Sequence, residues 1–314
     1  MWLSLAFLSA ALLGLYDVSK KAALKDNAVL PVLLLNTLFS TLIFSPFILD
    51  NAFGLGIFDG TIFDSSTYGK SGAIPGADGC GGDTARAHFL VIAKAFIVLS
   101  SWIAGYFGLK HLPITIVGPI NATRPVLVLV GAMLLFGERL NLLQWAGVLL
   151  AALSIFLMSI SSKKEHIDFR HNKWIFCVAA ATILGAVSGL YDKYIMRELG
   201  PMFVQSWFNL YQFIIMAVIC AVMWYPTRKQ TTPFHWSLAI PLISIFIAGA
   251  DFAYFNALGN PDSMISVVSL VRRGSVIISF AFGALIFKER NLKAKALDLV
   301  LVIVGMIFIW LGSR

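Results

Sequence analysis

The sequence predicts an all-α membrane protein with ten transmembrane helices, arranged as two inverted five-helix repeats. Of its 314 residues, 59% are hydrophobic and only 13% are charged, whereas soluble domains carry roughly 25% charged residues. Apolar runs of about 20 residues recur along the chain, and this is the length of a helix that crosses the hydrocarbon core. A third observation, an internal repeat, divides these runs into two related sets.

The repeat is read from short motifs that occur twice. The four residues that begin at Gly14 read Gly-Leu-Tyr-Asp, and so do the four that begin at Gly189. Further matches keep one constant spacing: Tyr106, Phe107, Pro113 and Arg124 correspond to Tyr254, Phe255, Pro261 and Arg272. In so hydrophobic a chain, an internal repeat is typical of a transporter built from two related bundles with a site between them.

Apolar stretches separated by short connections define the expected helices, and short connections favour antiparallel neighbours. The first stretch begins at Trp2 without a basic region before it, so we expect a retained helix and not a signal peptide. Five spans in each half bring the second half into the membrane from the opposite side, which makes the repeats inverted. We expect the ten helices at residues 2–24, 28–49, 87–110, 113–136, 140–160, 173–197, 201–224, 235–258, 262–287 and 293–312.

The two expected repeats occupy residues 1–160 and 173–314, and the polar linker 161–172 joins them. One segment has no counterpart in the second half: residues 50–86 form a long connection rich in glycine and aspartate. Loops of this length are usually functional or disordered. We interpret this one as a tolerated flexible insertion, with a lid or a partner-docking loop as the alternative.

Basic residues near the span ends predict the orientation of the chain. With the N-terminus outside, most loop Lys and Arg residues fall on the inner side, as the positive-inside rule requires. We therefore expect both termini outside, in a bacterial cytoplasmic (inner) membrane. Orientation in the bilayer also explains the net charge of +8 better than a nucleic-acid partner does.

A motif lies between the last two spans of each half. Residues 136–140 read Phe-Gly-Glu-Arg-Leu, residues 144–150 read Gln-Trp-Ala-Gly-Val-Leu-Leu, and residues 287–290 read Phe-Lys-Glu-Arg. With Leu112-Pro113 and Gly305, this pattern resembles the EamA family of the drug/metabolite transporter superfamily. The resemblance covers nearly the whole chain apart from the insertion. It implies a ten-helix secondary transporter that moves small metabolites by alternating access through a central cavity, without naming the substrate.

Charges at membrane depth are the best markers of a site, because each costs on the order of 3 kcal/mol or more to place there. Arg124, Arg272 and Arg273 lie about ten residues into their expected spans, near mid-bilayer. Three guanidinium groups that converge there would suit a carboxylate or a phosphate. Sugar-phosphate and nucleotide-sugar members of the superfamily look similar, with a basic pair in the ninth helix that holds the anion. The alternative is that internal carboxylates neutralise these arginines.

Other polar groups in the apolar spans complete the candidate site. We expect a contribution to substrate binding from Trp102, Tyr106, Asn121, Asp251 and Tyr254. Their alternative role is hydrogen bonding between helices.

A Tyr-Asp pair near the end of the first span of each half is a candidate for proton coupling or gating. These pairs are Tyr16-Asp17 and Tyr191-Asp192. A buried carboxylate can take up a proton on one side and release it on the other. The alternative is a helix-end position beside interfacial lysines. Lys94, early in the third span, is expected to snorkel to the interface.

Other classes of function find less support. Three scattered cysteines provide neither a disulfide framework nor a metal site, and we expect no cofactor. The sequence lacks a phosphate loop, so a gradient or an exchange would drive transport. The alternatives to a carrier are a channel or a membrane enzyme of the aspartyl-protease type, which would pair a Tyr-Asp with Gly249-Ala250-Asp251. We expect a non-enzyme whose partners are a small-molecule substrate and the lipid bilayer.

Overall fold

A computed structural model of the protein describes residues 2–24, 27–67, 84–111, 124–137, 139–160, 173–228 and 232–275, together with a few positions between 278 and 312. All of the described secondary-structure elements are helices. The chain divides into two compact units. Unit 1 comprises Met1–Phe96 and Asp192–Ser263, and unit 2 comprises Ile97–Tyr191 and Met264–Arg314.

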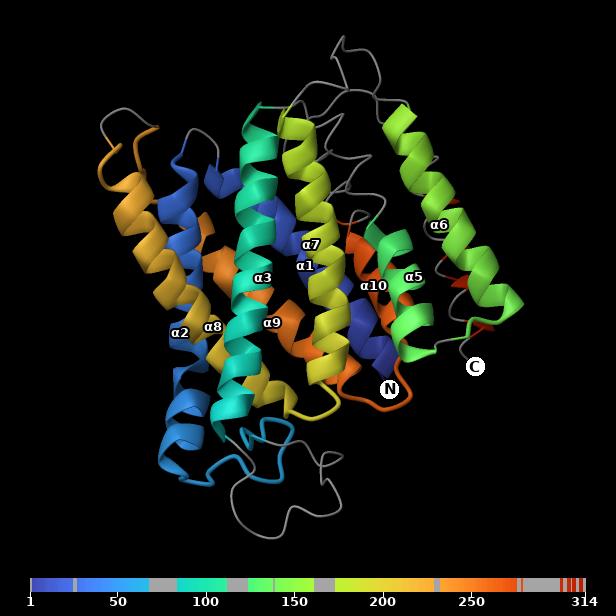
Figure 1. Ribbon diagram of the computed structural model, residues 1–314, viewed down its shortest axis with the longest axis horizontal. Helices are drawn as coiled ribbons and strands as arrows, with labels where there is room; N and C mark the ends of the chain where they lie inside the picture. The colour runs from blue at the N-terminus through green and yellow to red at the C-terminus, as the bar shows by residue number, and fades with distance from the viewer. Residues whose placement is uncertain are drawn as a thin grey trace. The chain divides into compact units, whose positions relative to one another are not determined.

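Unit 1 holds most of the long helices (Figure 1). They are α1 (Trp2–Leu24), α2 (Val29–Phe53), the first half of α3 (Thr84–His111), α8 (Pro201–Ile219) with the π-helical turn η1 (Cys220–Trp224), α9 (Ala239–Leu258) and the last turn of α7 (Lys173–Ile195). Within this unit, α1 packs along α9, and α2 packs against α8 and α9. The unit is therefore a bundle with α9 at its centre.

Unit 2 holds the second half of α3, most of α7, and three further helices. These are α5 (Arg124–Phe136), α6 (Leu142–Ile160) and α10 (Ile265–Arg273). In this unit α10 packs against α5. Hydroxyl and small side chains join α3 to α7: Ser101 Oγ donates to the Ala181 carbonyl at 2.7 Å, as expected where helices pack inside a bilayer.

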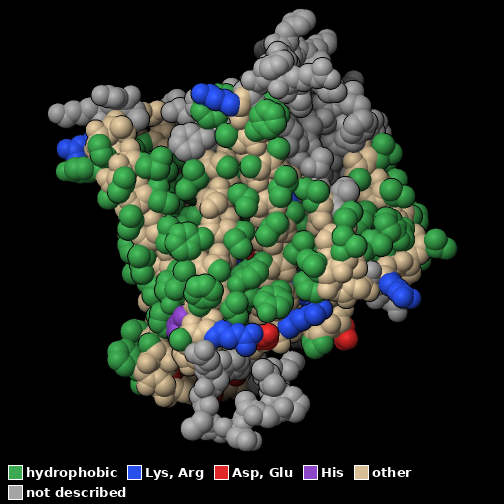
Figure 2. All heavy atoms as spheres, in the orientation of Figure 1, with side chains coloured by type: hydrophobic (Ala, Val, Ile, Leu, Met, Phe, Trp, Pro, Cys, Tyr) green, Lys and Arg blue, Asp and Glu red, His purple; other side chains and the backbone are tan. Residues whose placement is uncertain are grey.

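Six helices in the described part of the chain are long and apolar enough to cross a membrane. They are Trp2–Lys20, Val29–Phe53, Thr84–Gly105, Lys173–Ile195, Pro201–Trp224 and Ala239–Leu258. Their outer faces carry large exposed side chains, among them Leu42, Phe96, Ile183, Val218 and Ile245. Figure 2 shows such hydrophobic side chains spread over the helices of one face. An apolar surface of this extent suits contact with lipid and not with water. The prediction of an all-α membrane protein is confirmed, while ten helices and inverted repeats stay predictions.

Small residues allow α1 to approach α9 closely. A Cβ added to Gly249 would lie 3.1 Å from Cδ1 of Leu12. Beside it, Ser9 Oγ donates to the Ala250 carbonyl at 2.7 Å. Since lipid tails are as apolar as leucine, close van der Waals packing and such interhelical bonds replace the hydrophobic effect as the force that joins helices. This contact holds the part of α9 that carries Asp251 and Tyr254.

Several expected helix ends differ from the observed ones. The second helix was expected to end at residue 49, but α2 continues to Phe53 and ends at Gly54, whose φ of 60° is left-handed. The eighth was expected to begin at residue 235, but α9 begins at Ala239, because Asn27 hydrogen-bonds both the backbone N–H and the carbonyl of His235. Pro261 and Asp262 stay in a turn before α10. Residues 113–123 of the fourth expected span lie outside the described residues.

The first part of the 50–86 segment is tied to the bundle. The Asp50 carboxylate accepts hydrogen bonds from the Ile57 N–H at 2.8 Å and from Ser65 Oγ at 2.5 Å. Trp207 Nε1 of α8 donates to Asn51 Oδ1 at 2.9 Å. Residues 54–67 are thus a folded loop that Asp50, at the end of α2, organises, which is not the loose insertion we expected. Residues 68–83 lie outside the described part.

Candidate functional site

The centre of the candidate site is an ion pair between α3 and α7. Lys94 Nζ donates a hydrogen bond to Oδ1 of Asp192 and forms an ion pair with it. The pair is sealed from solvent, because Lys94 is 2% exposed and Asp192 is 5% exposed. Both residues belong to unit 1. The expectation that Lys94 snorkels to the interface is wrong, since its ammonium group turns inward to a carboxylate.

A second helix holds the other oxygen of this carboxylate. Tyr254 of α9 donates its hydroxyl to Asp192 Oδ2 at 3.1 Å. One turn earlier on α9, Asp251 lies near enough for its charge to act on Asp192. The structure therefore brings together Asp192, Tyr254 and Asp251, which the sequence singled out separately. It adds Lys94, which was not among the residues expected at the site.

Aromatic rings surround the ammonium group of Lys94. Its Nζ lies 4.3 Å from the centroid of the Phe208 ring on α8 and 4.7 Å from that of Phe255 on α9. The two rings meet edge to face, with centroids 6.5 Å apart. Ring faces attract cations, and more strongly where water is excluded. A carboxylate and two rings therefore hold the ammonium group of Lys94 in this apolar setting.

Two amide side chains of α8 lie about one helical turn from Phe208, one of the two rings beside Lys94 Nζ. Gln205 and Gln212 are 0% and 2% exposed. Gln205 Nε2 donates to the Ala248 carbonyl at 2.8 Å, but Gln205 Oε1 and Gln212 Nε2 have no hydrogen-bond partner in the described part of the chain. The two residues precede and follow Phe208 by about one helical turn, so all three share a face of α8. Buried polar atoms without partners are rare and often mark functional places.

The next residue on α7 is a second buried lysine with a different role. Lys193 Nζ donates to the carbonyl and the hydroxyl oxygen of Ser263, each at 2.6 Å, and lies 3.4 Å from the Leu258 carbonyl. Leu258 is the last residue of α9. A cation there complements the negative end of the helix dipole. We interpret Lys193 as a cap for α9.

The predicted arginines lie in unit 2. Arg124 is the first residue of α5, and its Nη2 donates to the Gly185 carbonyl of α7 at 2.6 Å. A Cβ on Gly185 would lie 2.6 Å from Arg124 Cζ, so a larger residue there would displace this guanidinium. Arg272 and Arg273 form the last turn of α10, where the helix dipole favours cations. That the three arginines meet at one anion stays a prediction.

The remaining predicted residues are dispersed. Tyr16 is buried on α1, with Lys20 Nζ 5.5 Å from its ring centroid. Trp102 of α3 and Tyr191 of α7 are half-buried and belong to unit 2. Asn121 and the side chains of Asp17 and Tyr106 lie outside the described part of the chain. Their roles therefore stay predictions.

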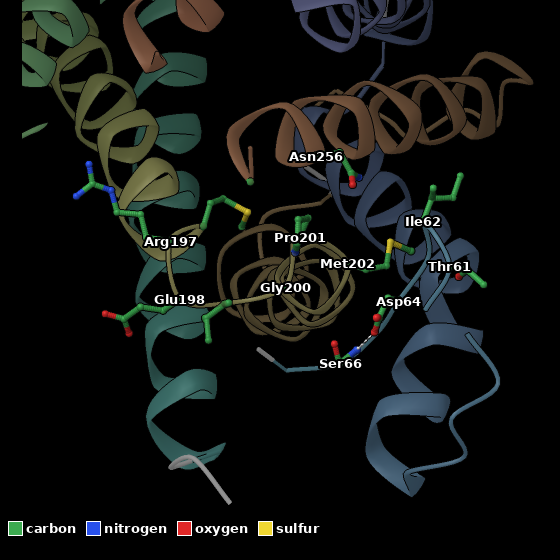
Figure 3. A pocket seen from close by; sticks show the side chains of 13 residues that line it. Thr61, Ile62, Asp64, Ser66, Arg197, Glu198, Gly200, Pro201, Met202 and Asn256 are labelled. Atoms are coloured by element: carbon green, nitrogen blue, oxygen red, sulfur yellow. Dashed lines mark hydrogen bonds between the residues drawn. The ribbon is translucent and has the colours of Figure 1, made fainter. Parts of the chain in front are cut away.

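A separate cavity of about 220 Å³ lies at the end of α7 in unit 1. Figure 3 shows Thr61, Ile62 and Asp64 of the folded loop on one side and Asn256 of α9 on another. The side chains of Arg197 and Glu198 point away from its centre (Figure 3), and Glu198 pairs with Arg86 at 3.2 Å. The 50–86 segment thus supplies one wall of a cavity, and Asp192 is not among its lining residues.

Comparison with known proteins places this helical membrane protein in a family. The model of the EamA-like transporter family matches residues 1–160. The chain belongs to the EamA-like transporter family. A solved structure described only as "Crystal structure of protein" is similar over 100% of this chain and 97% of its own, with 16% identity and a TM-score of 0.67, which is a likeness of fold alone. No curated protein matches the chain.

Membership of the EamA-like family confirms the resemblance that the Glu-Arg motifs indicated. It makes the protein a multi-pass membrane protein of a transporter family within the drug/metabolite transporter superfamily. A small-molecule substrate and a lipid environment follow from this membership. The family match gives no support to the alternative of a membrane enzyme of the aspartyl-protease type.

Proposed function

We propose that this EamA-like protein is a secondary transporter of a small metabolite that carries an anionic group. A gradient or an exchange drives it, and alternating access moves the substrate through a central cavity at the membrane midplane. The observation that supports this most is the buried Lys94–Asp192 pair inside apolar helices. Charged groups at that depth are expensive, and they commonly belong to a substrate or ion pathway.

The proposed carrier has ten helices in two inverted repeats, residues 1–160 and 173–314, joined by the linker 161–172. Both termini lie outside, in a bacterial cytoplasmic membrane. The helices supply two kinds of residue to the transport path. Substrate ligands are Arg124, Arg272, Arg273, Asn121, Trp102, Tyr106, Tyr254 and Asp251, and coupling or gating residues are Tyr16, Asp17, Tyr191 and Asp192.

Arginine is the expected ligand for the anionic group, because its planar fork binds a carboxylate or a phosphate through two hydrogen bonds. Arg272 follows the apolar run of α10 and lies at its C-terminal end. Arg272→Ala should therefore abolish transport while the variant remains folded. Arg228→Ala is the matched control, because Arg228 is exposed and contacts the ring of Tyr225 outside the spans.

Transport by the purified protein in proteoliposomes tests this function. A carrier gives saturable uptake of a labelled anionic metabolite and counterflow when the lumen is preloaded, whereas a channel gives no counterflow. The absence of saturable flux across a broad panel of anions and amino acids would contradict the proposal. Wild-type uptake by Arg272→Ala would remove this arginine from the site.

A further inference from the structure

We propose that Lys94 binds the carboxylate of the transported anion, and that Asp192 releases Lys94 by taking up one proton. This inference rests on the carrier function proposed above, assigns the anionic group to Lys94 in place of the three arginines, and adds the coupling ion. The site lies wholly in unit 1, whereas the three arginines belong to unit 2. The cargo of one cycle is one monocarboxylate and one proton.

Among its described contacts, Lys94 has one hydrogen-bond acceptor that a substrate carboxylate can replace. In the part of the chain that the structure describes, Asp192 is the only acceptor of a hydrogen bond from Lys94 Nζ. Its other neighbours are the faces of Phe208 and Phe255, which attract the charge but accept no conventional hydrogen bond. A substrate carboxylate can therefore take the place of Asp192 while the rings continue to hold the ammonium group.

Electroneutrality then requires the proton. An ammonium and a carboxylate sealed from water form a neutral pair, and an uncompensated charge there would be very costly. When a monoanion arrives, neutrality returns once Asp192 accepts a proton from hydronium on the open side. One O–H bond of hydronium breaks and leaves water, one O–H bond forms at Asp192, and the hydrogen bond from Lys94 moves to the substrate. Release of the proton on the opposite side returns Asp192 to Lys94 and expels the anion.

The surroundings of Asp192 suit this exchange. From α3 it faces Lys94, and from α9 it faces Tyr254 and the charge of Asp251. Packed against them, α8 contributes the uncharged ring of Phe208. The Tyr254 hydroxyl holds Oδ2, so the aspartate side chain stays in place after Oδ1 loses Lys94.

The charge balance and the neighbouring groups define the ligand class. One lysine and one proton-accepting carboxylate match a single negative charge, so a dianion such as phosphate fits poorly. The unpartnered Gln212 Nε2 is a donor and the unpartnered Gln205 Oε1 is an acceptor, and they share the face of α8 with Phe208. We therefore expect a small monocarboxylate with a hydroxyl or aromatic group next to its carboxyl.

Binding to the purified full-length protein at several pH values tests the exchange. The probes are lactate and benzoate, whose carboxylates stay ionised above about pH 6, with phosphate as the dianion. We expect the Kd of a monocarboxylate to fall about tenfold for each unit decrease in pH, because one proton binds with it. Asp192→Asn should bind the same probe with a Kd that does not change with pH, since asparagine mimics the protonated aspartate.

Control variants separate this role from a structural one. Lys193→Met, which removes the neighbouring buried lysine, should keep the wild-type dependence on pH. Lys94→Met should lose binding at every pH. Because Lys94→Met leaves Asp192 unpaired and could fail to fold, Lys94→Met/Asp192→Asn removes both charges and should fold without binding the probes. A pH-independent wild-type Kd, a retained slope in Asp192→Asn, or binding by the double variant would each overturn the proposal.

Counterflow in proteoliposomes distinguishes failure of the proton coupling from failure of the carrier function. An inward acid gradient should drive accumulation of the probe at least tenfold in wild-type vesicles and not in Asp192→Asn vesicles, which should still exchange it. Saturable counterflow without acid-driven accumulation would refute the coupling alone and leave the carrier intact. The absence of counterflow for every anion tested would refute the carrier.

Discussion

Two adjacent lysine sites in unit 1 solve the same physical problem in different ways. Lys94 and Lys193 are 2% and 5% exposed, and each must satisfy an ammonium group away from water. Lys94 does so with the charged carboxylate of Asp192. Among the acceptors of Lys193 at the end of α9 are neutral oxygens of Leu258, Asn260 and Ser263.

The nature of the acceptor decides whether the bond can be switched. A backbone carbonyl at a helix end has the same charge at every physiological pH, so the cap that Lys193 forms is permanent while the helix is folded. A carboxylate can be neutralised by one proton. The comparison therefore assigns Lys193 to the architecture of α9 and Lys94 to a bond that the transport cycle can break.

The largest expected effect comes from removing the cation of the switchable pair. Lys94→Met leaves the Asp192 carboxylate buried without its counter-charge, so we expect the free energy of unfolding to fall by about 3–5 kcal/mol. Denaturant unfolding in detergent, followed by tryptophan fluorescence, measures this change.

The double variant Lys94→Met/Asp192→Asn is the control for that measurement. Replacing both charged partners by uncharged side chains of similar size is often nearly neutral, so it should recover most of the lost stability. If the double variant were as unstable as Lys94→Met, packing and not charge would explain the loss, and the contrast with Lys193 would no longer hold.

The sequence predicted apolar helices and singled out Asp192 and Tyr254 as candidate site residues, but it did not predict that these two residues meet. Hydropathy reveals which stretches cross the membrane, because composition alone decides that. The internal repeat also indicates where Asp192 and Tyr254 lie along their helices. Which helices touch depends on side-chain packing, which periodicity does not report.

Lys94 shows the same limit most clearly. A lysine early in a span is usually interfacial, since its long stem can reach water. Only the tertiary structure reveals that a carboxylate and two aromatic rings lie closer than the interface does. The end of α2 at Gly54 and the folded loop around Asp50 depend likewise on local backbone geometry and long-range bonds.

An intermediate effect is expected at the permanent site. Lys193→Met removes the cation at the end of α9 and its bonds to Ser263, so stability should fall by about 2 kcal/mol. The same unfolding experiment measures it. The loss should be similar in magnitude at pH 6 and pH 8, because the oxygens of Leu258 and Ser263 that accept these bonds do not titrate. A loss that changed strongly with pH would show that Lys193 has a titrating partner. The contrast between the Lys94 and Lys193 sites would then no longer hold.

The smallest expected effect comes from removing one hydroxyl group, that of Tyr254, which holds the carboxylate of the switchable pair. Tyr254→Phe removes the hydrogen bond to Asp192 Oδ2, and we expect a loss of about 1 kcal/mol. Tyr211→Phe is matched, because its hydroxyl is hydrogen-bonded at 2.9 Å to Nδ1 of His88, a ring rather than a carboxylate. Bonds to an ionised group are roughly twice as strong as neutral ones, so Tyr254→Phe should be the more costly substitution in unfolding measurements near neutral pH. Equal losses would indicate that Asp192 is already neutral when it meets Lys94, and a proton could then no longer switch the pair.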